Sequence, residues 1–401
     1  MPIIKRPASS IILLFIATAL LNTISCKKDP VAAHHEEPGP KPGPHSNGPH
    51  LPATLYDYVS TINNMPAWMK AHMKAHPELD NTPADNPITN AGATLGRVLF
   101  YDKSLSVNNT VACASCHHQA NAFADITALS KGFDGGHTRR NAMPVVNIRF
   151  FPDRKMFWDF RAGDIETQTL MPIVDHVEMG MPDLATLEKK LSTIDYYPAL
   201  FKAAFGTTDI TAAKIGKALS QFLRSIVSFN SKYDQGVENN FANFTPQELE
   251  GLHIMQRDFC TECHSDLGTS QLGQRSSFLT LENTGINTGV GSNNGLETDY
   301  TDKGYGEITH QAKDQGTFKI PSLRNVALTA PYMHDGRFAT LDQVLDHYAA
   351  GIKGNPNLGI QLRPGGIPLS ADEKKNLIAF MHTLTDESLL KDVKYADPFV
   401  K

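Results

Sequence analysis

Apolar positions along this 401-residue chain recur mostly at the spacing of an α-helix. The segment that begins at Thr211 has one apolar face, formed by Ile215, Leu219, Phe222, Leu223 and Ile226. Capping boxes predict two more helices, Thr245–Glu248 ahead of Cys260 and Ser370–Glu373 ahead of Leu377, Ile378, Phe380 and Leu384. Alternating Val, Ile and Thr runs closed by Asn-Gly turns are scarce, so we predict a mainly α protein from about residue 54, with long loops such as 283–295.

The N-terminus has the pattern of an export signal. Lys5 and Arg6 precede an apolar run, residues 11–21, which is too short to span a bilayer but has the length of a signal-peptide core. It ends in Thr23-Ile24-Ser25-Cys26, which resembles the lipobox of bacterial lipoproteins. We therefore expect residues 1–26 to be a lipoprotein signal and residues 27–53, rich in Pro, Gly and His, to be a linker. The alternative is an ordinary secretory signal in which Cys26 is removed or remains a thiol.

Composition narrows the classes of function. At roughly 100–200 residues per domain the chain can hold two or three domains, and 41% hydrophobic residues suffice to build their cores. The chain has 37 Lys and Arg against 42 Asp and Glu, a net charge of −5. It lacks the basic excess of a nucleic-acid-binding protein, so we expect no nucleic-acid partner.

Four of the five cysteines form two C-x-x-C-H motifs, Cys113-Ala-Ser-Cys116-His117 and Cys260-Thr-Glu-Cys263-His264. Two thiols at this spacing can add to the two vinyl groups of a haem, and the adjacent histidine then ligates the iron. A zinc site would need both pairs together and would leave each histidine redundant, and a thioredoxin-like pair lacks its βαβ context. Two covalent c-type haems are therefore predicted, one in each of two domains, 54–240 and 241–401.

With these motifs, residues 86–385 resemble the bacterial di-haem cytochrome c peroxidases and their MauG-type relatives. The matching segments are Leu95–Asp102, Arg140–Ala142, Phe157–Ala162, Gln168–Pro172, Glu178–Gly180, Pro321–Val326 and Thr329–Gly336. The resemblance implies two cytochrome c-like domains, with a peroxidatic haem in the first and an electron-transfer haem in the second.

The resemblance also implies the residues around the peroxide. Gln168 and Glu178 match a Gln and a Glu on the open side of the first haem, where the carboxylate would move a proton between the peroxide oxygens. Trp158 matches a tryptophan between the haems, a candidate electron relay. Asn141, Thr329 and Pro331 match the ligands of one calcium ion between the domains.

Two positions depart from the peroxidases that need reductive activation. Phe133 stands where those members carry a histidine that blocks the peroxide haem. Because phenylalanine cannot ligate iron, we expect an open first haem, with His137 as the rival ligand. Tyr348 stands where the second haem's methionine ligand is expected, as in MauG-type enzymes. A tyrosinate would stabilise ferric iron; the alternative ligands are Met333, His347, Met381 and His382.

The resemblance thus implies an oxidoreductase that reduces H2O2 to water, with electrons from a small cytochrome c or cupredoxin entering at the second haem. A MauG-like oxidation of a protein or organic partner through high-valent iron, and a di-haem electron-transfer cytochrome without enzymatic activity, remain alternatives. The expected location is the periplasmic side of a bacterial membrane, with Cys26 carrying a lipid anchor. Family members are often dimers, but no pattern in the sequence fixes a homodimer.

Overall fold

The computed structural model describes residues 48–75, 77–151, 155–258, 260–264 and 291–400. All of them belong to one compact unit, and the predicted signal, with Cys26, and most of the linker lie outside them. Isolated β-bridges are the only extended pairings in the described residues, so the predicted mainly α fold is confirmed. The helices are α1 (Ala67–Ala75), α2 (Asn90–Tyr101), α3 (Ile165–Val174), α4 (Leu184–Ser192), α5 (Tyr197–Phe205), α6 (Ala212–Ser225), α7 (Lys232–Glu238), α8 (Pro246–Arg257), α9 (Thr261–His264), α10 (Gly306–Thr309), α11 (Leu341–Asp346) and α12 (Ala371–Thr383).

The three helices predicted from periodicity and caps are confirmed. Helix α6 begins after Thr211, whose hydroxyl accepts a hydrogen bond from the Lys214 N–H. Helices α8 and α12 each begin with the predicted capping box, at Thr245 and Ser370. In both boxes the glutamate three residues on accepts from the N-cap N–H, so two backbone donors at each helix start are satisfied within the motif.

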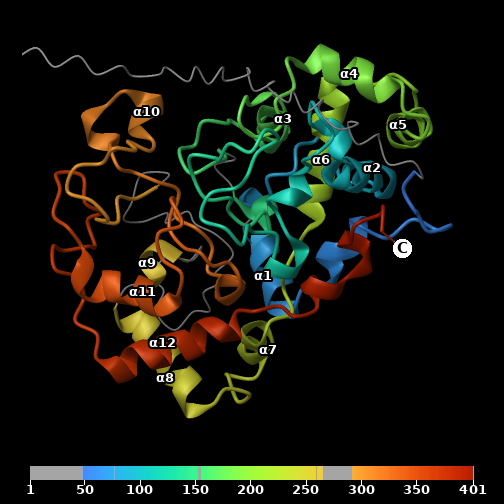
Figure 1. Ribbon diagram of the computed structural model, residues 1–401. Coiled ribbons are helices and arrows are strands. Elements are labelled where there is room, and N and C mark those ends of the chain that lie inside the picture. The colour runs from blue at the N-terminus through green and yellow to red at the C-terminus, as the bar shows by residue number, and fades with distance from the viewer. Residues whose placement is uncertain (1–47, 76, 152–154, 259, 265–290, 401) are drawn as a thin grey trace, which may run out of the picture. The chain divides into compact units, whose positions relative to one another are not determined.

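Two pairs of crossing helices organise the protein, α2 with α6 and α8 with α12 (Figure 1). Each pair meets at a glycine. A Cβ on Gly96 would lie 2.0 Å from the Ala218 carbonyl oxygen, and one on Gly251 would lie 2.0 Å from that of Asn376. Only glycine permits backbones to approach this closely. Each C-x-x-C-H motif follows the first helix of one pair, so the two halves repeat one arrangement.

Each helix pair has its own hydrophobic core. The first contains Phe100 of α2 and Phe222 of α6, and the second contains Leu252 of α8 and Phe380 of α12. Helix α7 packs into the second core through Tyr233 and Val237, although it precedes the expected domain boundary. The expected boundary between residues 240 and 241 stays a prediction.

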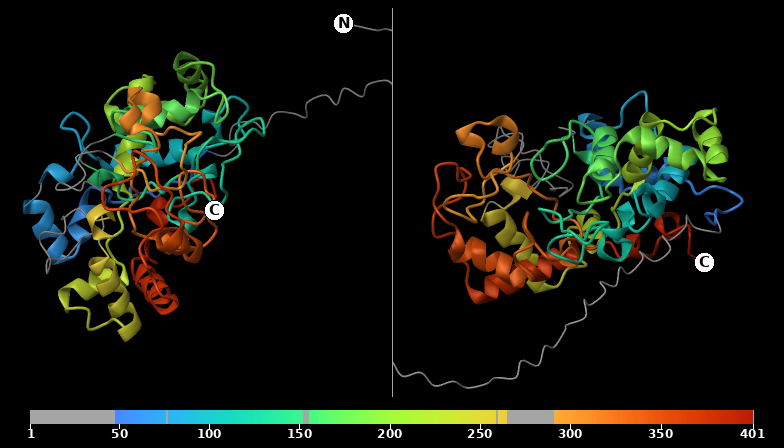
Figure 2. Two further views of the ribbon diagram at one scale, coloured as in Figure 1. Left: turned by 90° about the vertical axis from the view of Figure 1, so that its left-hand side faces the viewer. Right: turned by 45° about the horizontal axis from the view of Figure 1, so that its top comes forward.

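The C-terminal segment after α12 runs back along the first half of the protein (Figures 1 and 2). Leu389 and Tyr395 belong to the first core, and the Tyr58 hydroxyl donates to the Lys394 carbonyl at 2.6 Å. The described chain also begins within the expected linker, where the His50 N–H donates to the Pro398 carbonyl at 2.7 Å. The two ends of the described chain therefore pair with each other against the first core.

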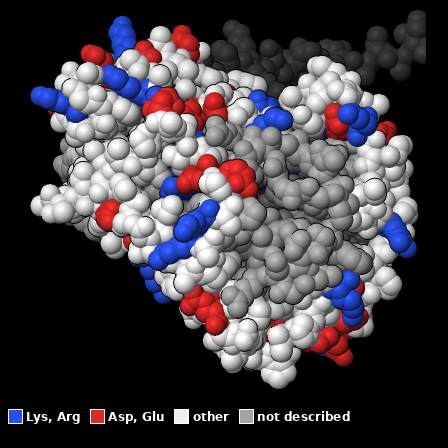
Figure 3. Space-filling model, turned by 180° about the vertical axis from the view of Figure 1, so that it is seen from behind, with Lys and Arg blue, Asp and Glu red and all other residues white. Residues whose placement is uncertain are grey.

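The face seen in Figure 3 carries Lys and Arg side chains next to Asp and Glu, without a patch of one sign over the described residues. This mixture agrees with the small net charge of the chain. Within the described ranges, no helix has the length and apolar character needed to cross a membrane.

Candidate functional site

The first C-x-x-C-H motif lies in the wall of a cavity between α2, α3 and α6. Cys113 begins a single 3-10 turn, Cys113–Ser115, and the His117 N–H donates to the Cys113 carbonyl at 3.0 Å. The cavity encloses about 630 Å³ of empty space, part of it open to solvent. Apolar side chains from α2 and α6, Phe100, Leu219 and Leu223, complete the wall behind the motif.

His117 is held in an orientation suited to metal binding. Its Nδ1 lies 3.0 Å from the Phe123 carbonyl oxygen, which leaves Nε2 for a ligand in the cavity. Burial lowers the pKa of His117, so the ring stays neutral, the form that ligates iron. His264 in the second motif repeats this contact, with Nδ1 3.0 Å from the Pro321 carbonyl oxygen and a lowered pKa.

Gln168 and Glu178 line the same cavity as Cys113, Cys116 and His117. Helix α3 carries Gln168, and its N-cap Asp164 accepts from the Thr167 N–H at 2.7 Å. Within the described part of the chain, neither the Gln168 amide nor the Glu178 carboxylate has a hydrogen-bonding partner. Both groups are therefore available to a small polar ligand in the cavity.

Glu178 has the electrostatic environment of a proton-transfer group. Burial raises its pKa to about 7, the nearby Asp175 carboxylate adds to this rise, and Arg161 opposes it. Asp175 also accepts from the Glu178 N–H at 3.1 Å and so fixes the turn that carries the carboxylate. At neutral pH Glu178 can both accept and donate a proton.

Phe133 packs beside this turn. Its N–H donates to the Glu178 carbonyl at 3.1 Å, and its carbonyl accepts from the Asn108 side chain at 2.8 Å. The ring covers Gly180, where a Cβ would lie 2.3 Å from it and where φ is +67°. His137, the rival ligand, is exposed and does not line the cavity. No imidazole other than His117 is among the lining residues.

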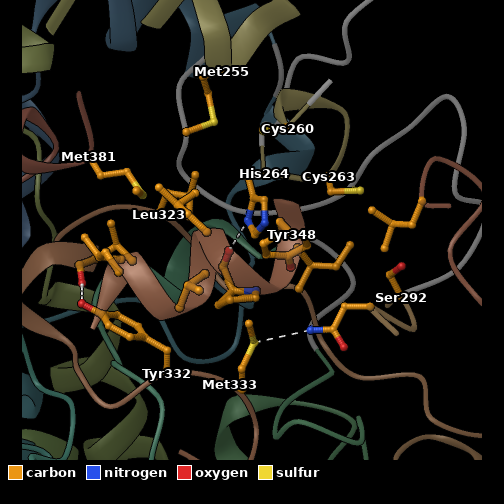
Figure 4. A pocket seen from close by; sticks show the side chains of 18 of the residues that line it. Met255, Cys260, Cys263, His264, Ser292, Leu323, Tyr332, Met333, Tyr348 and Met381 are labelled. Atoms are coloured by element: carbon orange, nitrogen blue, oxygen red, sulfur yellow. Dashed lines mark hydrogen bonds between the residues drawn. The ribbon is translucent and has the colours of Figure 1, made fainter. Parts of the chain in front are cut away.

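The second motif lines a larger and more apolar cavity. Helix α9 carries Cys263 and His264, and Cys260 directly precedes it. Figure 4 shows these side chains around the cavity with Tyr348 and Met333. The cavity has about 1420 Å³ of empty space, part of it open to solvent. Because the two Cys pairs line different cavities, a zinc site shared by both pairs is excluded.

Three of the candidate second ligands reach this cavity. Tyr348, Met333 and Met381 line it, whereas His347 and His382 do not. The Met333 sulfur accepts from the Asn294 side chain at 3.4 Å, and His347 Nε2 lies 2.9 Å from the Asn294 carbonyl. Tyr348 sits in a π-helical turn, His347–Gly351, an arrangement common at functional sites. Burial raises the pKa of Tyr348.

Trp158 also lines the second cavity and is 8% exposed. Its Nε1 donates to the Asn141 carbonyl at 2.8 Å, and its ring meets that of His334 edge-on at 6.5 Å. The Asn141 N–H in turn donates to the His334 carbonyl at 2.8 Å, which connects Asn141 to the segment of the other two expected calcium ligands. Of these, Thr329 directs its hydroxyl to the Val326 carbonyl at 3.2 Å, and Pro331 follows a cis peptide bond.

The residues in both cavities fit a covalently bound haem. Each cavity offers two thiols, a neutral histidine fixed through Nδ1, and a mainly apolar wall for a porphyrin. Burial raises the pKa of Cys113 and of Cys260 to about 12, so both thiols are protonated at neutral pH.

Comparison with known proteins agrees with this assignment. A family model described as di-haem cytochrome c peroxidase matches residues 90–241. The methylamine utilization protein MauG of Methylorubrum extorquens is 30% identical over 325 residues, 80% of this chain and 85% of that protein. The chain belongs to the di-haem cytochrome c peroxidase family. It is an oxidoreductase with two c-type haems, of the family that acts on peroxide.

Other similar proteins include two named as peroxidases and one described as MauG-like. The cytochrome c551 peroxidase of Nitrosomonas europaea is 30% identical, over 79% of this chain and 86% of that one. The crystal structure of a MauG-like protein associated with microbial copper homeostasis has a TM-score of 0.67 and 32% identity, covering 79% of this chain and 96% of that one. The diheme peroxidase BthA of Burkholderia thailandensis shares the fold, with a TM-score of 0.62 at 24% identity over 78% of this chain and 91% of that one.

Sequence analysis did not identify several residues that shape the cavities. Lys131 and Thr138 line the first, Lys319 lines the second, and Asp175 and Arg161 act on the Glu178 carboxylate. Arg161 lies in the matched segment Phe157–Ala162, which could have drawn attention to it. No pattern distinguishes Lys131, Thr138 and Lys319, because they line the cavities together with residues far away in the sequence, whereas Asp175 lies only three residues before Glu178.

Proposed function

We propose that this protein reduces H2O2 to water at the first haem, with electrons that enter through the second haem from a small cytochrome c or cupredoxin. The observation that carries the proposal is that Glu178, whose pKa is raised to about 7, shares one cavity with Gln168 and His117. Bound haem supplies the iron that binds peroxide and passes on the donor's electrons.

The Glu178 carboxylate takes the proton from the inner peroxide oxygen and returns it to the outer one. With this proton in place, the outer oxygen would leave as water rather than as hydroxide when a bound haem supplies the electrons for O–O cleavage. Two electrons and two further protons complete the conversion of H2O2 to two molecules of water. The Gln168 amide donates no hydrogen bond to any other described residue. It is therefore free to donate one to the peroxide and so to orient it.

Trp158 is proposed as the relay for electrons between the haems. Its burial and its hydrogen bond to the Asn141 carbonyl hold the ring in a fixed place in the wall of the second cavity. Calcium at Asn141, Thr329 and Pro331 would hold the segment around Asn141 against residues 329–334. The hydrogen bond from the Asn141 N–H to the His334 carbonyl already joins these two segments. Tyr348 is proposed as the second ligand of the haem bound at His264.

A second candidate is a MauG-like oxidase of a protein or organic partner. It is favoured by Phe133, which offers no iron ligand, and by Tyr348 in the second cavity. Export to the periplasm and a lipid anchor at Cys26 belong to the proposal in both cases.

The test is steady-state turnover of H2O2 with ferrocytochrome c or a reduced cupredoxin as donor. A peroxidase consumes two donor electrons for each H2O2. Rapid mixing with peroxide that produces an oxidised state, together with negligible donor turnover, would instead favour the partner oxidase. A di-haem electron carrier would react rapidly with the donor and only slowly with peroxide.

A further inference from the structure

Lys319 is a positive charge in the wall of the second cavity. It lines this cavity together with Cys260, Cys263 and His264. Its backbone N–H donates to the Trp158 carbonyl at 2.8 Å, which fixes the strand-like segment next to the tryptophan. The side chain is half-buried, and its ammonium lies over the Phe151 ring, 4.1 Å from the ring centre.

The described residues provide no anion for this charge. No carboxylate forms an ion pair with the Lys319 ammonium in the described ranges, and no acceptor there receives a hydrogen bond from it. The Phe151 ring offers a cation–π contact, which is weaker than an ion pair in a desolvated place. Burial lowers the pKa of Lys319 to about 8, but at neutral pH most molecules still hold the charge.

Charges that are partly withdrawn from water are generally paired in proteins, so a half-buried cation with no anion among the described residues marks a place where an anion can bind. The group that fits this cavity brings such an anion, because every haem carries two propionate carboxylates in addition to its vinyl groups. A haem held at Cys260, Cys263 and His264 would also remove water from the cavity wall that contains Lys319.

We propose that Lys319 binds a propionate of the second haem and that this ion pair raises the reduction potential of that haem. A cation near the iron favours the state with one more electron, and it cancels the propionate charge that would oppose reduction. Lys319 is thus a positioning residue that makes the second haem easier to reduce by a donor, next to the proposed relay Trp158. The inference needs only the two haems and is independent of which reaction the first haem performs.

The test is a potentiometric titration of the protein with both haems attached, in which each haem is followed by its visible and electron paramagnetic resonance spectra. Lys319→Met keeps an unbranched apolar side chain, one atom shorter than lysine, and removes the charge, whereas Lys319→Arg keeps the charge. Lys313→Gln is the matched control, because Lys313 lies six residues away, is exposed and carries the same charge.

In Lys319→Met we expect the ratio of ferrous to ferric second haem at a fixed potential to fall by about tenfold, which corresponds to 59 mV for one electron. Lys319→Arg should stay near the wild-type potential, and Lys313→Gln should match the wild type. Equal potentials in Lys319→Met and Lys313→Gln would overturn the proposal. If Lys319→Met changed the potential only by disturbing the fold, Lys319→Arg would not restore the wild-type potential.

A measurement on the wild-type protein covers the case in which Lys319→Met fails to acquire haem. The propionate bending modes in the resonance Raman spectrum of the second haem should shift in D2O, because the ammonium N–H donors exchange. If the propionate bending modes of the wild-type protein do not shift in D2O, the ion pair is refuted, and no variant is needed for this result. A shift that persists in Lys319→Arg and disappears in Lys319→Gln supports it.

Discussion

Replacing Glu178 with glutamine removes the proposed proton carrier and keeps the size of the side chain. The carboxylate lines the first cavity with Gln168 and His117, and it has no hydrogen-bonding partner among the described residues whose loss would disturb the fold. General acid–base catalysis contributes about 10²- to 10⁴-fold to a rate. The Glu178→Gln variant should therefore lose about 10²- to 10⁴-fold in kcat/KM for H2O2, with unchanged haem content.

The raised pKa of Glu178 also predicts how kcat/KM should change with pH. The reaction needs the Glu178 carboxylate, whose pKa is raised to about 7, so the rate should rise as the pH increases through that value. At pH 6 about a tenth of the molecules hold the carboxylate, and kcat/KM should be about tenfold below its plateau. This acidic limb should be absent in Glu178→Gln.

Two neighbouring variants should move the limb in opposite directions. Asp175→Asn removes the like charge that raises the pKa of Glu178, so the limb should move to lower pH. Arg161→Gln removes the cation that lowers this pKa, so the limb should move to higher pH. The control is Glu250→Gln, on the exposed side of α8, which should leave the profile unchanged.

The assay is the initial rate of peroxide reduction with ferrocytochrome c between pH 5 and pH 8.5, at low peroxide so that it reports kcat/KM. A Glu178→Gln variant that retains the wild-type rate and acidic limb would refute the proton-transfer role. Shifts of the same sign in Asp175→Asn and Arg161→Gln would show that the electrostatic argument is wrong.

Three further outcomes are expected from the same geometry. The fully oxidised protein should react with H2O2 without prior reduction, because Phe133 offers no ligand; a resting first haem that is entirely low-spin with two histidines, seen by electron paramagnetic resonance, would contradict this. Tyr348→Phe should change the visible spectrum of the second haem, and an unchanged spectrum would reject Tyr348 as its ligand. Asp234→Asn should lower the free energy of unfolding in denaturant by about 3–5 kcal/mol. The side chains of Asp234 and Arg324 are each 1% exposed, so the variant leaves the Arg324 charge buried without its bidentate partner. A loss below about 1 kcal/mol would contradict this.

The sequence by itself determined the local parts of this protein. The starts of α6, α8 and α12 follow from Thr211, Thr245 and Ser370, because a cap and the helix it begins lie within a few residues. The spacing of the two C-x-x-C-H motifs predicted two haems for the same reason, since thiols and histidine fall within one turn of chain. Resemblance to a known family added Gln168 and Glu178, which do line the cavity of the first motif.

Only the tertiary structure decided how distant segments meet. It provides the Pro321 carbonyl that fixes His264, and it pairs the C-terminal segment near Lys394 with Tyr58 of the first core. It also brings Lys319 over Phe151 without an acidic partner in the described residues. The contact between Tyr58 and Lys394 joins positions 336 residues apart, and the energy of such contacts depends on burial and on distance in space. No local pattern of residues encodes either quantity, so the charges that tune the two cavities became visible only in the folded chain.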